Sequence, residues 1–356
     1  MQTLRELFNE ISLDNERWSY YKNTNILIND CWESSDSDKA LCFIENYFNF
    51  ANKSNAFNDI HLRKNRDILK MRSNHIISTF LLGIKIAESF NIDCDTRSED
   101  GFNFKYYWFL SCLYHDIGYA YEKKNSSEQL KKIRNDGIAA LKQICNIEYL
   151  DDSIFKSISK EHVNIYFKYR AANNREHGGT IDYGIIGGLI LYDRLRKQFE
   201  ISWKKRINKN DDRTSFYVIG ADNRKLHLSN SHFVAYAKVA DSIIRHSIFN
   251  ETLNCYIKEE KTNIPLFNEK ISIDNKLGFV LGIADTLEPL KRNHKYLDSV
   301  SLETIKEPPG IRICIKEEDY NKLYSKIEEL KDWISVNIKS FKEESNIIVE
   351  ITGNTN

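Results

Sequence analysis

Proline is scarce in this sequence, and no segment of it is long and apolar throughout. Only four prolines occur in 356 residues, so the commonest cause of helix interruption is nearly absent. No run approaches the roughly 18 uninterrupted apolar residues of a membrane-spanning helix. The first ten residues alternate charged with apolar side chains and differ from a signal peptide. We therefore expect a helix-rich, soluble, cytoplasmic protein without a membrane partner.

The sequence also lacks paired cysteines and an excess of charge of either sign. Its seven cysteines are odd in number and scattered and include no CxxC pair, which argues against a disulfide framework or a thiolate zinc site. Lys and Arg together number 51, as do Asp and Glu, so the formal net charge is zero. Long-range attraction to a long nucleic acid or an anionic membrane is therefore not expected. This balance favours a phosphate-containing small molecule or a short nucleic acid as partner, and it leaves a homo-oligomer open.

Apolar residues recur at helical spacing through most of the chain, which predicts a mainly α protein with a helical domain over residues 1–297. Two of its predicted helices, over 74–90 and 104–114, are largely apolar. Two stretches depart from this pattern and are predicted to be insertions. The first, about 119–175, is charged and polar, and we expect it to roof a site. The second, about 201–232, reads as two short strands around a turn, that is, a surface hairpin.

The periodicity changes after about residue 298. Apolar and polar residues alternate, as in β-strands, over 300–305, 311–315 and 346–351. The apolar residues over 317–341 have the spacing of a long amphipathic helix. The sequence therefore predicts a small β-β-α-β appendage over 298–356, packed on the helical domain.

Six side chains that can bind metal ions lie in apolar, helical sequence, where an uncompensated polar group is costly. They are His75, His115, Asp116, His177, His246 and Asp285. Any one of these histidines alone is more often a hydrogen-bonded core residue, and Asp285 alone could pair with Arg245 or Arg292. As an ordered set of nitrogen and oxygen donors they predict one or two divalent ions, with Mn²⁺, Fe²⁺, Ni²⁺, Zn²⁺ and Mg²⁺ all open.

The order His…His-Asp…His…His…Asp along helical sequence resembles the HD superfamily of metal-dependent phosphohydrolases. The resemblance covers about residues 70–295. Its most specific part is Tyr114-His-Asp-Ile-Gly118, and Gly282-Ile-Ala-Asp285 resembles the segment that closes the family's series. The resemblance implies an HD-type helical bundle with one ion held by His75, His115, Asp116 and Asp285. It also implies a second ion bridged by Asp116 and held by His177 and His246.

The same resemblance implies hydrolysis of a phosphoester or phosphodiester of a nucleotide or nucleic acid by metal-activated water. Asp116 would be catalytic, and Arg175 and Lys123 are candidates for neutralising the phosphate. One departure is that Arg245 precedes His246, where some dinuclear members carry paired histidines. Two alternatives remain: a non-catalytic HD-fold module that binds a nucleotide or regulates, and a helical interaction protein whose histidines are packing residues.

Overall fold

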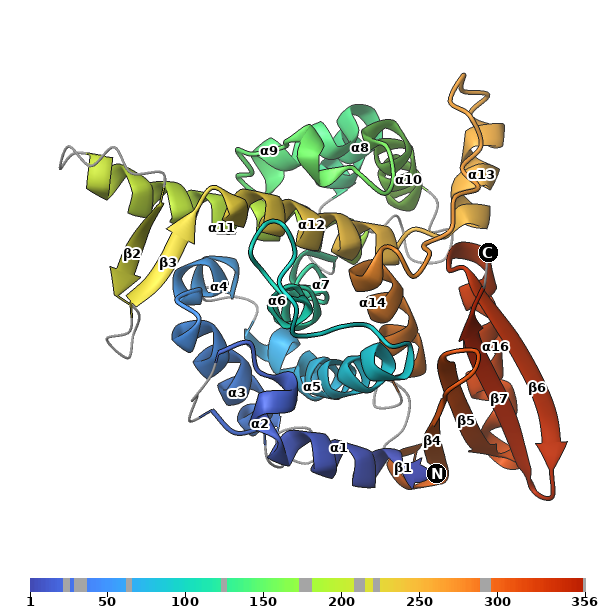
Figure 1. Cartoon of the computed structure of the whole chain (residues 1–356). Helices are drawn as coiled ribbons and strands as arrows, with labels where there is room; N and C mark the ends of the chain where they lie inside the picture. The colour runs from blue at the N-terminus through green and yellow to red at the C-terminus, as the bar shows by residue number, and fades with distance from the viewer. Residues whose placement is uncertain are drawn as a thin grey trace.

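The computed structural model describes residues 1–21, 26–28, 37–61, 66–122, 127–172, 181–207, 215–219, 225–288 and 296–354. The protein is mainly helical and carries a small antiparallel sheet at the C-terminal end of the chain, as the sequence predicts (Figure 1). Within the described ranges, no helix has both the length and the apolar character needed to cross a membrane.

The centre of the molecule is a helix that is buried along its whole length, α6 (Phe104–Tyr114). The Asn103 side chain caps its first turn by accepting a hydrogen bond from the Tyr106 N–H at 3.3 Å. Helices from distant parts of the chain surround it: α5 (Arg66–Ser89), α11 (Tyr183–Ile207), α12 (Ser231–His246) and α14 (Lys276–Leu287) (Figure 1). Full burial explains why the sequence of α6 is largely apolar around the whole helix.

The contact between α5 and α6 depends on one tryptophan and one glycine. The buried indole of Trp108 on α6 donates a hydrogen bond to the Phe80 carbonyl oxygen of α5 at 3.0 Å. Its ring covers Gly83, where an added Cβ would lie 1.9 Å from the nearest ring carbon. The absence of a side chain at Gly83 therefore sets how closely the two helices approach.

Short N-terminal helices pack on α5 and α11. They are α1 (Leu4–Leu13), α2 (Asn15–Trp18), α3 (Ser37–Phe50) and α4 (Ser54–His61). Trp18 packs edge-on against Phe43 and Phe80, with ring centroids 5.8 and 6.0 Å apart. These aromatic contacts join the N-terminal helices to the core.

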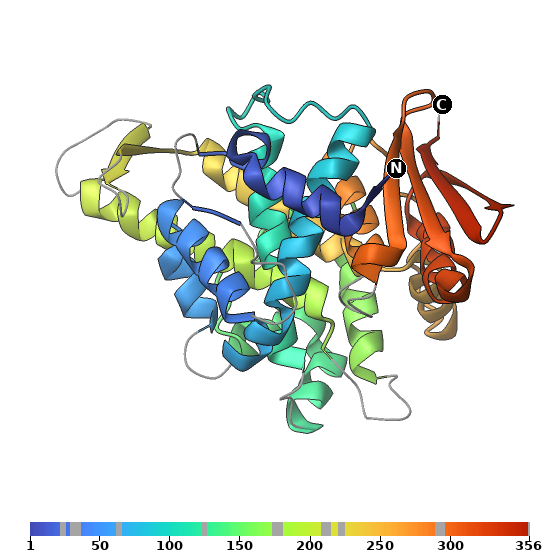
Figure 2. The same ribbon diagram turned by 90° about the horizontal axis from the view of Figure 1, so that it is seen from below.

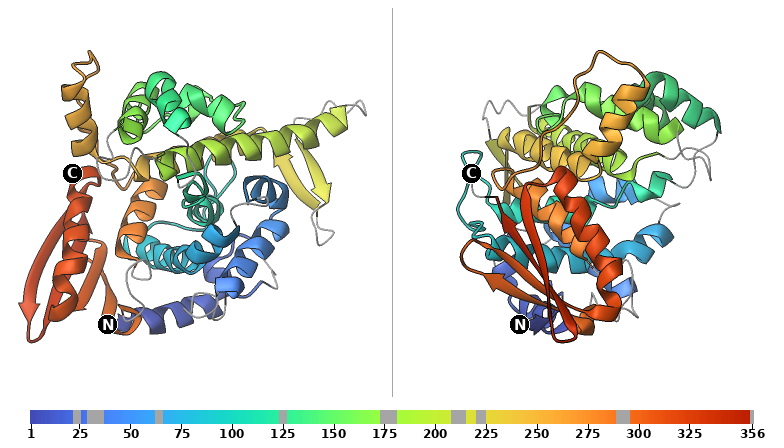
Figure 3. Two further views of the ribbon diagram at one scale, coloured as in Figure 1. Left: turned by 180° about the vertical axis from the view of Figure 1, so that it is seen from behind. Right: turned by 90° about the vertical axis from the view of Figure 1, so that its right-hand side faces the viewer.

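Residues 127–172 of the first insertion lie on the side of α11 and α12 that faces away from α5 (Figures 1 and 3), whereas its first helix packs against both α5 and α11. The insertion contains α7 (Tyr119–Glu122), α8 (Ser127–Asp136), η1 (Gly137–Ala140), α9 (Leu141–Ile144), η2 (Asp152–Ile154) and α10 (Lys160–Ala172). Two buried carboxylates anchor it. Asp193 of α11 accepts the backbone N–H groups of residues 148 and 149, and Asp241 of α12 accepts those of residues 156 and 157, at 2.7–3.1 Å.

The expected hairpin between α11 and α12 is present as β2 (Ser215–Ile219) and β3 (Lys225–Ser229). Helix α13 (Asn250–Glu259) follows α12, and α15 (Tyr296–Ser299) leads into the C-terminal sheet. That sheet contains β4 (Val300–Ile305), β5 (Gly310–Lys316), β6 (Val336–Glu343) and β7 (Asn346–Gly353), with α16 (Glu317–Trp333) between β5 and β6. Figure 2 shows the two chain termini on this side of the molecule.

The predicted β-β-α-β order is incomplete, because the helix expected over 317–341 ends at Trp333 and 336–343 forms the strand β6. β6 is the edge strand, pairs only with β7 and is largely solvent-exposed, so its many charged residues resemble a solvated helix face in sequence. In addition, β1 (Gln2–Thr3) pairs with β4 and adds a fifth strand from the N-terminal end of the chain. The sheet order is β1-β4-β5-β7-β6.

A methyl group at Gly83 tests the packing of α5 on α6. We expect Gly83→Ala to lower the free energy of unfolding by about 1–3 kcal/mol, because the buried, hydrogen-bonded indole of Trp108 has no room to move. Gly353→Ala is the control, since nothing lies within 4 Å of its added Cβ, and should change stability by less than about 0.5 kcal/mol. Urea unfolding of the two variants measures both values, and equal stabilities would contradict this packing.

Candidate metal centre

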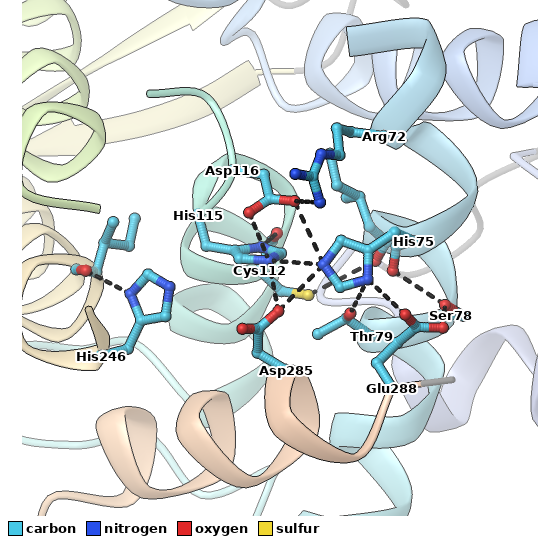
Figure 4. Close-up of polar contacts among 12 residues, drawn as sticks. Arg72, His75, Ser78, Thr79, Cys112, His115, Asp116, His246, Asp285 and Glu288 are labelled. Carbon is cyan, nitrogen blue, oxygen red and sulfur yellow. Dashed lines mark hydrogen bonds and ion pairs between the residues drawn. The ribbon is translucent and has the colours of Figure 1, made fainter. Parts of the chain in front are cut away.

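The structure brings four of the six predicted ligands into direct contact, from three distant parts of the chain (Figure 4). His75 lies on α5, His115 and Asp116 follow the last turn of α6, and Asp285 lies on α14. The ordered series of ligands thus corresponds to three helices that meet at one point of the core.

The nitrogen and oxygen atoms of these four residues lie very close together. His75 Nε2 is 3.1 Å from Asp285 Oδ1 and 3.3 Å from Asp116 Oδ2. His115 Nε2 is 3.3 Å from an oxygen of each carboxylate, and the two Nε2 atoms are 3.4 Å apart. His75, His115 and Asp116 are buried, and their ligand atoms all lie within 4.8 Å of one another, a spacing that could hold a metal ion.

Hydrogen bonds at the opposite ring nitrogens fix how the imidazoles are presented. The Nδ1–H of His115 donates to the Cys112 carbonyl oxygen at 2.6 Å, and that of His75 donates to Glu288 Oε2 at 2.6 Å. In the neutral imidazoles the Nε2 atoms therefore carry lone pairs. Nitrogen lone pairs and carboxylate oxygens facing one another at 3.1–3.4 Å repel unless a cation, or a proton on Nε2, lies among them. This donor set fits a divalent ion with nitrogen and oxygen preference.

His246, at the end of α12, lies beside this cluster, with its ring centroid 5.7 Å from that of His115. Its Nδ1–H donates to the Ile243 carbonyl oxygen, so its Nε2 likewise carries a lone pair. That Nε2 is buried and has no hydrogen-bond partner among the described residues. Burial lowers the pKa of His246 to about 4, although the Asp285 carboxylate acts in the opposite direction. His246 is thus a neutral imidazole with an unused acceptor atom.

Two residues that sequence reasoning missed contact the cluster directly. Glu288, fully buried at the end of α14, accepts hydrogen bonds from the His75 ring and from the Ser78 hydroxyl. Arg72 lies one helical turn before His75 and places Nη1 3.9 Å from Asp116 Oδ2. Both stand three residues from a predicted ligand on the same helix, a spacing that places side chains on one face. That spacing was the available sequence signal.

A tyrosine pair holds the Arg72 side chain in place. The guanidinium lies over the Tyr119 ring at 3.8 Å, and Tyr119 stacks on Tyr183 with centroids 4.0 Å apart. Gly118 makes this arrangement possible, because a Cβ there would lie 1.8 Å from the Tyr183 carbonyl oxygen. Burial acts to lower the pKa of Arg72, but nearby negative charge, chiefly that of Asp116, outweighs it and raises the pKa. The arginine is therefore a permanent cation at the cluster.

Asp182, also missed from sequence, holds the start of α11 against the end of α12. This buried carboxylate accepts hydrogen bonds from the Ile185 N–H at 3.0 Å and from the Ser247 hydroxyl at 2.8 Å. Burial raises its pKa, and Arg170 is the main opposing influence. Because Ser247 follows His246, Asp182 helps to fix the position of that imidazole.

The other predicted site residues are not placed at the cluster. Lys123, Arg175 and His177 lie outside the described residues, so their roles stay predictions. Arg245 points elsewhere: it donates to the carbonyl oxygens of Ile248 and Glu269 and thereby holds the chain after α12. The sequence alternative in which Arg245 neutralises Asp285 is therefore not the arrangement found.

Comparison of the chain with protein-family models, with curated proteins and with solved structures finds no match. The site is consequently interpreted from its own geometry and chemistry.

The lowered pKa of His246 predicts a specific pH dependence in the metal-free protein. Between pH about 6.5 and about 4 the unfolded chain binds a proton at this ring and the folded chain does not. The free energy of unfolding should therefore fall as the pH is lowered through this range, by up to about 3 kcal/mol. Urea unfolding at several pH values measures the slope. In the His246→Gln variant the free energy of unfolding should depend less on pH in this range. A variant with the same pH dependence as the parent would contradict the lowered pKa of His246.

Proposed function

We propose that this protein is an HD-type, metal-dependent phosphohydrolase that cleaves a phosphoester or phosphodiester of a nucleotide or short nucleic acid. The observation that carries the proposal is the convergence of His75, His115, Asp116 and Asp285 on one buried point. Four acceptor groups of this kind in one place are stabilised by a divalent cation. Their order along the chain is the basis of the family resemblance.

These four residues would hold one ion, and Asp116 with His246 and His177 would hold a second. A bound ion of this kind polarises phosphoryl oxygens and lowers the pKa of a coordinated water toward neutrality. Glu288 would act through His75: its carboxylate orients the ring and increases the basicity of Nε2. The unused Nε2 atom of His246 supports the second position.

The exposure of the side chains indicates where a substrate would approach. Asp116 and His115 side chains are completely buried, whereas the Asp285 side chain is 15% exposed and that of Arg72 is 29% exposed. A phosphate entering on this side would meet the Arg72 guanidinium first. Arginine suits this role because its planar donors match two phosphoryl oxygens and because it keeps its charge. Tyr119 would keep the guanidinium aligned as negative charge develops on the phosphoryl group.

Metal content and activity together test the proposed function. The purified protein should contain at least one divalent ion per chain and hydrolyse a member of a phosphomonoester, phosphodiester and nucleotide panel supplied with Mn²⁺, Mg²⁺, Ni²⁺ or Fe²⁺. Asp116→Asn should lose both the bound ion and more than about 99% of the activity, because a ligand shared by the whole cluster is neutralised. The exposed Asp298→Asn should behave like the parent protein. Full activity of a metal-loaded Asp116→Asn protein would refute the proposal.

Arg72 can be tested separately from metal binding. Arg72→Ala should lower kcat/KM by about 10- to 100-fold, the effect of losing a charge-assisted hydrogen bond to the substrate, while metal content stays unchanged. Arg72→Lys should recover part of the loss, since it keeps the charge without the planar donor pair. The surface variant Arg5→Ala is the control. Unchanged kinetics of Arg72→Ala would exclude this residue from substrate binding.

A further inference from the structure

Four basic side chains are buried in the part of the chain that the structure describes: Lys53, Lys105, Arg194 and Arg245. Three of them are compensated. Lys105, Arg194 and Arg245 each donate to backbone carbonyl oxygens, and Lys105 and Arg194 also pair with carboxylates. This is the normal condition of a buried cation, because desolvation without a partner strongly disfavours the charged form.

Lys53 is the exception. The residue lies in the turn between α3 and α4 and is only 6% exposed. Among the described residues, its ammonium group makes no hydrogen bond and no ion pair. Its one recorded interaction is with the Tyr236 ring, whose centroid is 5.4 Å from Nζ. A cation–π contact at this distance compensates only part of the desolvation of an ammonium group. The Lys53 ammonium group therefore lacks a counter-ion.

The same lysine lines a cavity of about 440 Å³, which is within the usual size range of small-molecule sites. Much of the remaining wall is aromatic, from Tyr20, Tyr21, Phe102, Tyr106 and His232. His232 begins α12 at the end opposite His246, about 21 Å away along the helix at 1.5 Å per residue. The cavity is thus separate from the candidate metal centre.

The acidic groups around this cavity do not supply the missing counter-ion. Asp100 lines the cavity, but it pairs with Lys238 at 2.6 Å and also accepts a hydrogen bond from the Ser98 hydroxyl. Glu99 is exposed on the wall together with the exposed Arg97, so their formal charges cancel. What remains is the ammonium of Lys53, which belongs to a largely buried side chain in the cavity wall and has no counter-ion among the described residues.

We propose that this cavity is a second ligand site, which binds a small aromatic anion. The carboxylate, phosphate or sulfonate group of the ligand pairs with Lys53 Nζ, and its ring packs against the tyrosine-rich wall. The pairing restores the compensation that the other three buried cations already have. Aromatic stacking and a charge-assisted hydrogen bond in a partly dry cavity together give both affinity and selectivity for anions over neutral ring compounds.

Anilinonaphthalene sulfonate is a suitable probe, because it is an aromatic anion whose fluorescence rises in an apolar site. Titrations are made with EDTA present, so that the candidate metal centre takes no part and the result is independent of the proposed function. We expect saturable binding of one probe per chain. Displacement of the probe by adenosine monophosphate would identify a phosphate ligand, and displacement by benzoate would identify a carboxylate ligand. Neutral adenosine should displace the probe at least about tenfold more weakly than the monophosphate does.

Lys53→Met removes the charge and keeps a similar side-chain volume. It should weaken probe binding by about tenfold or more, and it should leave the melting temperature of the ligand-free protein unchanged or higher, because the removed cation makes no hydrogen bond or ion pair in the described structure. Lys53→Arg should retain binding, and Lys258→Met, at an exposed lysine of α13, should match the parent. Absence of saturable binding, or equal binding by Lys53→Met and the parent, overturns the proposal.

Discussion

Mutual repulsion among buried acceptor atoms is the constraint on which the centre of this structure depends. Two imidazole nitrogens and two carboxylates meet at 3.1–3.4 Å with little or no water around them. The hydrogen bonds at Nδ1 of His75 and His115 hold the rings in this orientation rather than allowing them to turn away. A group of buried acceptors oriented toward one another in this way could hold a metal ion.

Much of this centre could be predicted from the sequence, because ligand-type residues stand out in apolar helices. The order of His75, His115, Asp116 and Asp285 was sufficient to expect that they meet. What could not be predicted were the residues whose importance arises only from tertiary contact. Arg72 reads as an ordinary charge near the start of a helix, and its position beside Asp116 depends on how α5 crosses the end of α6.

The buried aspartates show why apolar surroundings alone do not identify a metal ligand. Asp193 and Asp241, like Asp285, lie on helices with apolar neighbours in sequence, and both are buried. Their oxygens accept backbone N–H groups of the insertion, which is a structural solution to the same desolvation problem. The Asp285 oxygen instead faces two imidazoles. The partner of a buried carboxylate, which only the folded structure reveals, separates the structural role from the candidate functional one.

The edge strand β6 was missed for a related reason, since its exposed charges are typical of both a helix face and an edge strand.

Two regions of the molecule, the Lys53 cavity and the acceptor cluster, lie along the same two helices. The first turn of α12 contains His232, beside the Lys53 cavity, and the helix ends at His246, beside the acceptor cluster. The first turn of α6 likewise contains Tyr106 of the cavity wall, and His115 follows its last turn. Each helix therefore connects the two regions through the core. If a ligand at the Lys53 cavity changed cation affinity at the cluster, reciprocal linkage would require a cation at the cluster to change that ligand's affinity by the same factor.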